Sequence, residues 1–191
     1  MRAFIGLPLP HEIRASLKEL QRELATAGAD VKWVEPQNVH VTLKFLGEIT
    51  EPQRQDIERR LREIGAASIS FIAQLAKPGA FPSWSAPRVI WIGIEPGDKP
   101  MSALAARIEE AMGGVGIAKE PKPFAVHVTI GRVRSARGLR ELSARIRGLQ
   151  WQPPKPWTVS TVTLYESRLS PGGPTYAVLA ETPLGRSVEA G

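Results

Sequence analysis

The chain has 191 residues, of which 42% are hydrophobic and 23% are charged, and this ordinary globular composition excludes a disordered or coiled-coil protein. It contains no cysteine, which excludes disulfides, thiolate metal sites and cysteine nucleophiles and indicates a cytoplasmic location. No apolar run reaches the roughly 18 residues of a membrane-spanning helix. Pro8 and Pro10 interrupt the apolar N-terminus, so it is a poor signal peptide and fits a first strand better.

The formal net charge of +6 is concentrated in one segment of the chain. Residues 119–147 contain eight basic and two acidic side chains, a surplus equal to the whole net charge. Such a field favours an anionic partner, most simply a phosphate-bearing one. A solvated basic helix face fits the charges equally well, so both interpretations stay open at this point.

In chain order, short apolar strands alternate with amphipathic helices. Thr50 is predicted to cap a helix, with Gln53 as its capping-box partner. The Pro/Gly/Ser-rich stretch 77–87 is expected to be a loop, and the tail after Pro183 is expected to fray. Strands are predicted over 2–7, 39–46, 69–75, 89–94, 126–130, 158–164 and 176–180, and helices over 13–24, 57–64, 101–112 and 139–149.

Two parts of the chain repeat each other. Phe4-Ile5-Gly6-Leu7 is similar to Trp91-Ile92-Gly93-Ile94, and residues 36–43 are similar to residues 123–130, in both cases 87 residues apart. The repeat predicts two copies of strand–helix–strand–helix–strand. We expect one domain over 1–183, with lobes of roughly 1–80 and 88–183 that can exchange terminal strands, and a tail over 184–191.

The repeated element with chemical potential is a His-x-Thr sequence inside an apolar strand. Because side chains alternate along a strand, His40 and Thr42 are expected on one face, and His127 and Thr129 on the corresponding face of the second copy. Phe45 falls on the opposite, apolar face and is expected to pack in the core. Pseudo-symmetric strands can place both motifs on one groove.

Two imidazoles and two hydroxyls suit displacement at phosphorus. One imidazole can accept a proton from the attacking group while the other donates one to the leaving oxygen, and threonine hydroxyls can bind phosphate. His11, the third histidine, is expected to lie exposed at a helix start. No metal or other cofactor is expected, because too few ligands have suitable spacing.

The paired motifs and their surroundings resemble the RNA 2',3'-cyclic phosphodiesterase branch, also called 2'-5' RNA ligase, of the 2H phosphoesterase superfamily. The resemblance runs from Arg2 to about Ala180. It is carried by Arg2-Ala3-Phe4-Ile5, Trp33-Val34, His40-Val41-Thr42-Leu43-Lys44-Phe45-Leu46-Gly47-Glu48, Gly79-Ala80-Phe81-Pro82-Ser83, Pro87-Arg88-Val89-Ile90-Trp91 and His127-Val128-Thr129-Ile130-Gly131-Arg132.

This resemblance implies a bilobal α+β fold of mainly antiparallel sheets, with the two motifs facing a central cleft. It implies hydrolysis of terminal 2',3'-cyclic phosphates of RNA to 2'-phosphates, and reversible 2'-5' joining of tRNA-like fragments. Separately, we expect a monomer without membrane attachment. By the family pattern His40 is the proton donor and His127 the proton acceptor. By the same pattern, Thr42, Thr129 and Arg132 are expected to bind the phosphate.

Two details of this site stay open in the sequence. Strict alternation places Arg132 opposite His127, so a bulge at Gly131 or an approach from the strand end is needed. Trp33, Phe81 and Trp84 are candidates to stack on a base.

Two other functions fit the same residues. One is a non-catalytic module that binds RNA or phosphate, although a mere binder could use Arg or Lys instead of two histidines. The other is a 2H enzyme for a small cyclic nucleotide or for ADP-ribose cyclic phosphate.

Overall fold

The computed structural model describes residues 1–185. The helices are α1 (His11–Ala25), α2 (Glu51–Ala66), α3 (Asp98–Gly113) and α4 (Leu139–Arg147), with a short 3-10 helix η1 (Pro36–Asn38). The strands are β1 (Arg2–Pro8), β2 (Val31–Trp33), β3 (His40–Glu48), β4 (Phe71–Ala73), β5 (Leu75–Phe81), β6 (Val89–Ile94), β7 (Val128–Val133), β8 (Trp157–Val159), β9 (Thr161–Ser170) and β10 (Gly173–Pro183).

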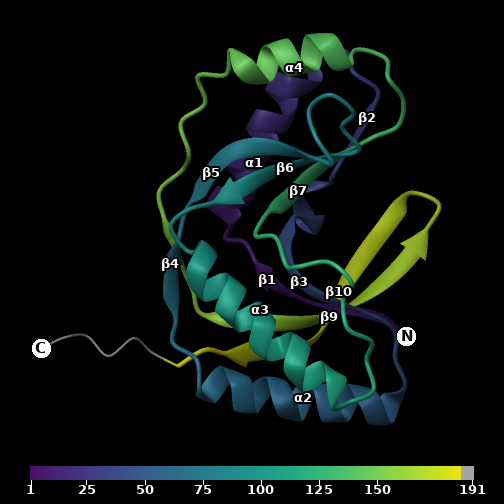
Figure 1. The fold of residues 1–191 in the computed structure, drawn as a ribbon, viewed down its shortest axis with the longest axis vertical. Coiled ribbons are helices and arrows are strands. Elements are labelled where there is room, and N and C mark those ends of the chain that lie inside the picture. Colours follow the sequence, from purple (N-terminus) through teal and green to yellow (C-terminus); the bar gives the residue numbers. More distant parts are fainter. Residues whose placement is uncertain (186–191) are drawn as a thin grey trace, which may run out of the picture.

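The strands form two four-stranded antiparallel sheets and a small β4-β8 pair. The first sheet has the order β10-β9-β1-β3, and α2 and α3 cover one of its faces (Figure 1). The second sheet has the order β2-β7-β6-β5 and lies with α1 and α4 at the other end of the molecule (Figure 1). The predicted α+β class with antiparallel sheets is therefore confirmed.

The sheets cut across the sequence halves. The order β1-α1-β3-α2 recurs as β6-α3-β7-α4, as the repeat predicts. However, β9 and β10 from the end of the chain join β1 and β3, while β2 from the first half joins β7. Both larger sheets are thus built from residues on both sides of the boundary expected at 77–87.

The predicted cap of α2 is present. The backbone N–H of Gln53 donates to the Thr50 hydroxyl at 3.4 Å, and the Thr50 N–H donates to the Gln53 side-chain oxygen at 3.0 Å. These bonds satisfy amide groups that a helix start otherwise leaves unpaired.

The loop predicted over 77–87 is wrong in its first part, because residues 75–81 form strand β5. As the edge of its sheet, β5 tolerates Pro78, whose missing N–H costs no ladder bond to a further strand. Gly79 is required by packing, since a Cβ there would overlap the indole ring of Trp91. The Pro- and Gly-rich composition that suggested a loop is that of an edge strand.

The fraying predicted after Pro183 is wrong for the next two residues. Leu184 is buried, and the Gly185 N–H donates to the carbonyls of Gly65 and Ser68 at 3.1 and 2.9 Å. The rest of the predicted tail, 186–191, lies outside the described residues.

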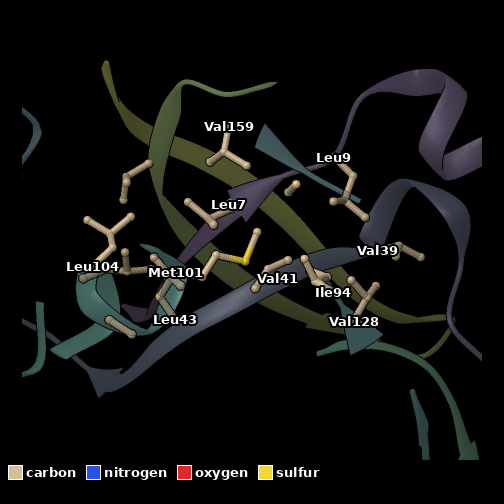
Figure 2. Packing of buried hydrophobic residues seen from close by; sticks show 14 of the residues in the cluster. Leu7, Leu9, Val39, Val41, Leu43, Ile94, Met101, Leu104, Val128 and Val159 are labelled. Atoms are coloured by element: carbon tan, nitrogen blue, oxygen red, sulfur yellow. The ribbon is translucent and has the colours of Figure 1, made fainter. Parts of the chain in front are cut away.

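The apolar side chains form one continuous cluster that reaches both sheets. Figure 2 shows Val41 and Leu43 of β3 with Met101 of α3, and Val128 of β7 near Ile94 of β6. The core therefore fixes the two histidine-bearing strands relative to each other. Within residues 1–185, no helix is both long and apolar enough to cross a membrane.

Candidate active site

The two His-x-Thr motifs stand at the starts of corresponding strands. His40 is the first residue of β3, and His127 directly precedes β7. The sequence predicts that this second strand begins at residue 126, but in the structure β7 begins two residues later, at Val128. β3 and β7 belong to different sheets but approach each other. The carboxamide of the buried Gln21 on α1 fixes the end of β2 against β7 by donating to the carbonyls of Val34 and Ile130 at 2.8 and 2.9 Å.

His40 lies in an aromatic enclosure. Its ring stacks on Phe4 at a centroid distance of 4.6 Å and meets Tyr176 edge-on at 5.2 Å. Room for the ring comes from Gly6, where a Cβ would come within 3.3 Å of the imidazole. The ring is thereby held in one plane at the strand end.

Hydrogen bonds fix which nitrogen of His40 carries the proton. Nδ1 lies 2.6 Å from the Asn38 carbonyl oxygen, and because a carbonyl only accepts, Nδ1 is the donor. Nε2 lies 2.8 Å from the Thr42 hydroxyl. In the neutral ring this nitrogen accepts from the hydroxyl, and in the protonated ring it donates.

His127 repeats this arrangement with one difference. Its Nδ1 donates to the Ala125 carbonyl at 2.6 Å, and its ring meets Phe81 edge-on at 5.0 Å. Within residues 1–185, the Nε2 atom of His127 makes no hydrogen bond like the one between Nε2 of His40 and the Thr42 hydroxyl. The lone pair on this nitrogen is therefore open to a substrate.

Burial lowers the pKa of both imidazoles. For His40 it outweighs the favourable bond to Asn38 and lowers the pKa from 6.5 to about 4. The pKa of His127 is also lowered, first by burial and then by the positive charge of Arg132, against the raising effect of the bond to Ala125. Both rings are therefore neutral near pH 7 before an anion binds.

A β-bulge follows each motif. β1 pairs Gly6 with Thr42 but Ile5 with Lys44, so Leu43 is an extra residue in β3. In the second sheet, Trp91 pairs with Thr129 but Ile90 with Gly131, so Ile130 is the extra residue in β7. Each bulge shifts the alternation of side chains by one residue.

The bulges resolve the position of Arg132 and overturn that of Phe45. Arg132 is turned to the face of Thr129, and its charge acts on both His127 and Tyr176. Since Tyr176 touches His40, the surroundings of the two histidines adjoin at Arg132. Phe45 is not in the core as predicted: 57% of it is exposed, and Lys44 is buried instead.

The aromatic residues at the site only partly match the candidates. Of the three candidates, Phe81 touches His127. Trp33 and Trp84 make no ring contact with either histidine within residues 1–185. Sequence reasoning missed Phe4 and Tyr176, which depend on strand pairing. His11 is exposed at the start of α1, as expected. The described part of the chain contains no group of three metal-ligating side chains.

A buried ion pair connects β3 to the segment before His127. The Lys44 ammonium lies 2.8 Å from Glu109 of α3 and 3.0 Å from the Ala118 carbonyl. The other carboxylate oxygen of Glu109 accepts from the Glu120 N–H at 3.0 Å. The strand that carries His40 thus helps to place the segment that leads to His127.

The chain is similar to known proteins over nearly its whole length. The family model of LigT-like phosphoesterases matches residues 7–91 and 92–176, so that each match contains one His-x-Thr motif. An RNA 2',3'-cyclic phosphodiesterase of Aquifex aeolicus is 36% identical, covering 97% of this chain and 98% of its own length. One of Archaeoglobus fulgidus is 35% identical, with 92% and 96% covered. A crystal structure from Thermus thermophilus superposes with a TM-score of 0.79 at 29% identity, covering 96% of this chain and 98% of the other.

Proposed function

Since the chain belongs to the LigT-like phosphoesterase family, we propose that it opens 2',3'-cyclic phosphate ends of RNA to leave a 2'-phosphomonoester. The observation that carries this proposal is the matched pair of imidazoles. Each donates through Nδ1 to a carbonyl two residues earlier in the chain and presents Nε2. A mere binder of phosphate has no need for two such fixed tautomers.

The proposed reaction is an in-line attack of water on phosphorus. Nε2 of His127 takes a proton from the water as the new P–O bond forms, and the bond from phosphorus to the 3'-oxygen breaks. Nε2 of His40 gives its proton to that oxygen. Thr42, Thr129 and Arg132 bind the phosphate oxygens, and the opposite charge of the phosphate raises the pKa of the adjacent rings so that one of them can carry the proton.

The same groups can also join two RNA ends. When a 5'-hydroxyl of a second RNA end replaces water as the attacking group, the two ends are joined by a 2'-5' link, with the same roles for the two histidines. Cleavage of that link is the reverse reaction, in which His40 accepts a proton and His127 donates one. We therefore include reversible 2'-5' ligation in the proposal.

The direct test is to identify the product. Incubation with RNA that ends in a 2',3'-cyclic phosphate, in the presence of EDTA, is expected to give only the 2'-phosphate isomer, because only the 3'-oxygen leaves. Chromatography against both isomers reads the outcome. A 3'-phosphate product, or activity that disappears in EDTA and returns with zinc or manganese, would contradict the mechanism.

The pH profile follows from the lowered pKa values of both imidazoles. Because kcat/KM reports groups of the free enzyme, its bell-shaped maximum is expected below pH 6.5, the ordinary value of histidine. The profile of kcat is expected at higher pH, since bound phosphate favours the protonated rings. Initial rates between about pH 4 and 9 measure both profiles. A kcat/KM maximum above pH 6.5 would contradict the burial argument.

The basic segment is proposed to attract the body of the RNA. Arg137, Arg140 and Arg145 are exposed, and no ion pair engages them within residues 1–185, whereas exposed Arg59 on α2 pairs with acidic neighbours. Reversing the three charges to Glu is expected to raise KM severalfold for a tRNA-sized substrate at low salt, with little effect on a cyclic mononucleotide. The salt dependence of KM for the long substrate should flatten in the same variant.

The matched control reverses Arg59 and Arg62 on α2, at the other end of the molecule from α4 (Figure 1). It should leave both substrates unaffected. Equal effects of the triple charge reversal on long and short substrates would remove the RNA-attracting role of the basic segment and leave the proposed catalysis unchanged.

A further inference from the structure

The two motifs share the same order of burial through the sixth residue, although their fifth and sixth residues differ in chemistry. From His40 to Phe45 and from His127 to Arg132, the positions alternate in the same order between half-buried, buried and exposed. The extra residue of each bulge, Leu43 or Ile130, also occupies the same place. Phe45 is therefore the counterpart of Arg132 in the other half of the site.

Phe45 lies on the open face of the first sheet. The neighbours of Phe4 along β1, Ala3 and Ile5, point into the core that includes Ile57 of α2, so Phe4 points to the opposite face. Phe45 pairs with Phe4 across β1 and β3, and their ring centroids are 6.3 Å apart. The exposed ring thus continues an aromatic surface that begins at His40.

This surface extends across the sheet. Phe4 also pairs with Tyr165, whose ring stacks on it at 4.9 Å, and Tyr165 pairs with Val178 of β10. Of the apolar side chains in this row, Phe45 and Val178 at its two ends are exposed, by 57% and 54%. Only Phe45 lies on the strand that carries His40.

We propose that Phe45 stacks on the base of the nucleotide that carries the cyclic phosphate. The inference rests on the proposed function and assigns different tasks to the two halves of the pseudo-symmetric site. In the His127 half, the residue after the bulge is a cation suited to phosphate. In the His40 half it is an uncharged aromatic ring suited to the face of any base.

Charge and exposure both agree with a nucleotide as the occupant. Arg2 and Arg132 both act on Tyr176, so the aromatic surface next to His40 lies within a positive field. Single exposed apolar residues are common and need no partner. Phe45 differs because its ring is continuous with the rings that enclose a histidine of the site.

The test removes the ring and the base separately. Phe45→Ala is expected to raise KM for adenosine 2',3'-cyclic phosphate about tenfold, with kcat nearly unchanged, as expected for loss of one stacked base. Phe45→Trp keeps an aromatic ring at this position, so its KM should stay near the wild-type value. Val178→Ala shortens the other exposed side chain of the row and should leave KM unchanged. For 1-O-methylribose 2',3'-cyclic phosphate, which has no base, Phe45→Ala should have no effect.

The outcomes separate this inference from the proposed function. A wild-type protein that fails to open any of these cyclic phosphates would refute the proposed function itself. Normal turnover with a KM that does not respond to Phe45→Ala would overturn only the stacking role. An equal loss with the base-free substrate, or a loss confined to a dinucleotide, would also overturn it, because the ring would then serve the sugar or the preceding base.

Discussion

His40→Ala and His127→Ala are each expected to lower kcat for a cyclic phosphate by about 10² to 10⁴. Each variant removes one of the two Nε2 atoms that the mechanism uses for proton transfer. His11→Ala, at the exposed start of α1, is the matched control and should retain full activity. Circular dichroism and thermal unfolding check that the variants fold, which matters most for His40 because its ring stacks on Phe4.

A sulfur-substituted substrate distinguishes the donor from the acceptor. When sulfur replaces the 3'-oxygen, the leaving thiolate needs no proton, since a thiol has a pKa of about 8.5. His40→Ala should then regain most of the lost rate, whereas His127→Ala should not. Recovery by His127→Ala instead would exchange the two roles, and full activity of both variants on the natural substrate would refute the acid–base mechanism.

Glu109→Ala is expected to destabilise the protein by about 3–5 kcal/mol, the usual cost of leaving a buried charge without its partner. The Lys44 side chain is fully buried, with 0% exposed, and removal of Glu109 leaves its ammonium with the Ala118 carbonyl as its remaining hydrogen-bond acceptor among residues 1–185. Urea unfolding of the variant near neutral pH measures the loss of free energy of unfolding.

Lys44→Met provides the matched control for this ion pair. It leaves Glu109 unpaired, but that carboxylate is 27% exposed and can be hydrated. Methionine also fills much of the space of the lysine chain, so a loss of only about 1 kcal/mol is expected. If Lys44→Met lost as much free energy of unfolding as Glu109→Ala or more, the cost of Glu109→Ala would not come from the buried, unpaired ammonium.

Local chemistry explains what the sequence predicts well. The Thr50–Gln53 capping box involves two residues three positions apart, so its bonds can be inferred without any knowledge of the fold. The alternation of His40, Val41 and Thr42 likewise needs only a strand. Both predictions hold because no distant residue takes part in them.

Pairing between distant strands explains what the sequence could not predict. Phe45 and Lys44 exchange their expected places because β3 bulges against β1, and Arg132 is re-aimed because β7 bulges against β6. Gly131 in the second motif suggests a bulge as one of two ways to re-aim Arg132, but nothing in the first motif signals the extra residue at Leu43. The composition of 75–81 was misleading for a related reason, since Pro78 and Gly79 are tolerated by an edge strand next to Trp91.

The strand exchange between the two halves bears on how the molecule can move. The chain crosses from one four-stranded sheet to the other between β1 and β2, between β2 and β3, between β3 and β5, and between β7 and β9. A rigid-body opening of the two layers about one hinge would strain all of these connections and split the shared core. The separation of the two imidazoles is therefore established when the protein folds, so bringing them together costs no further entropy during each turnover.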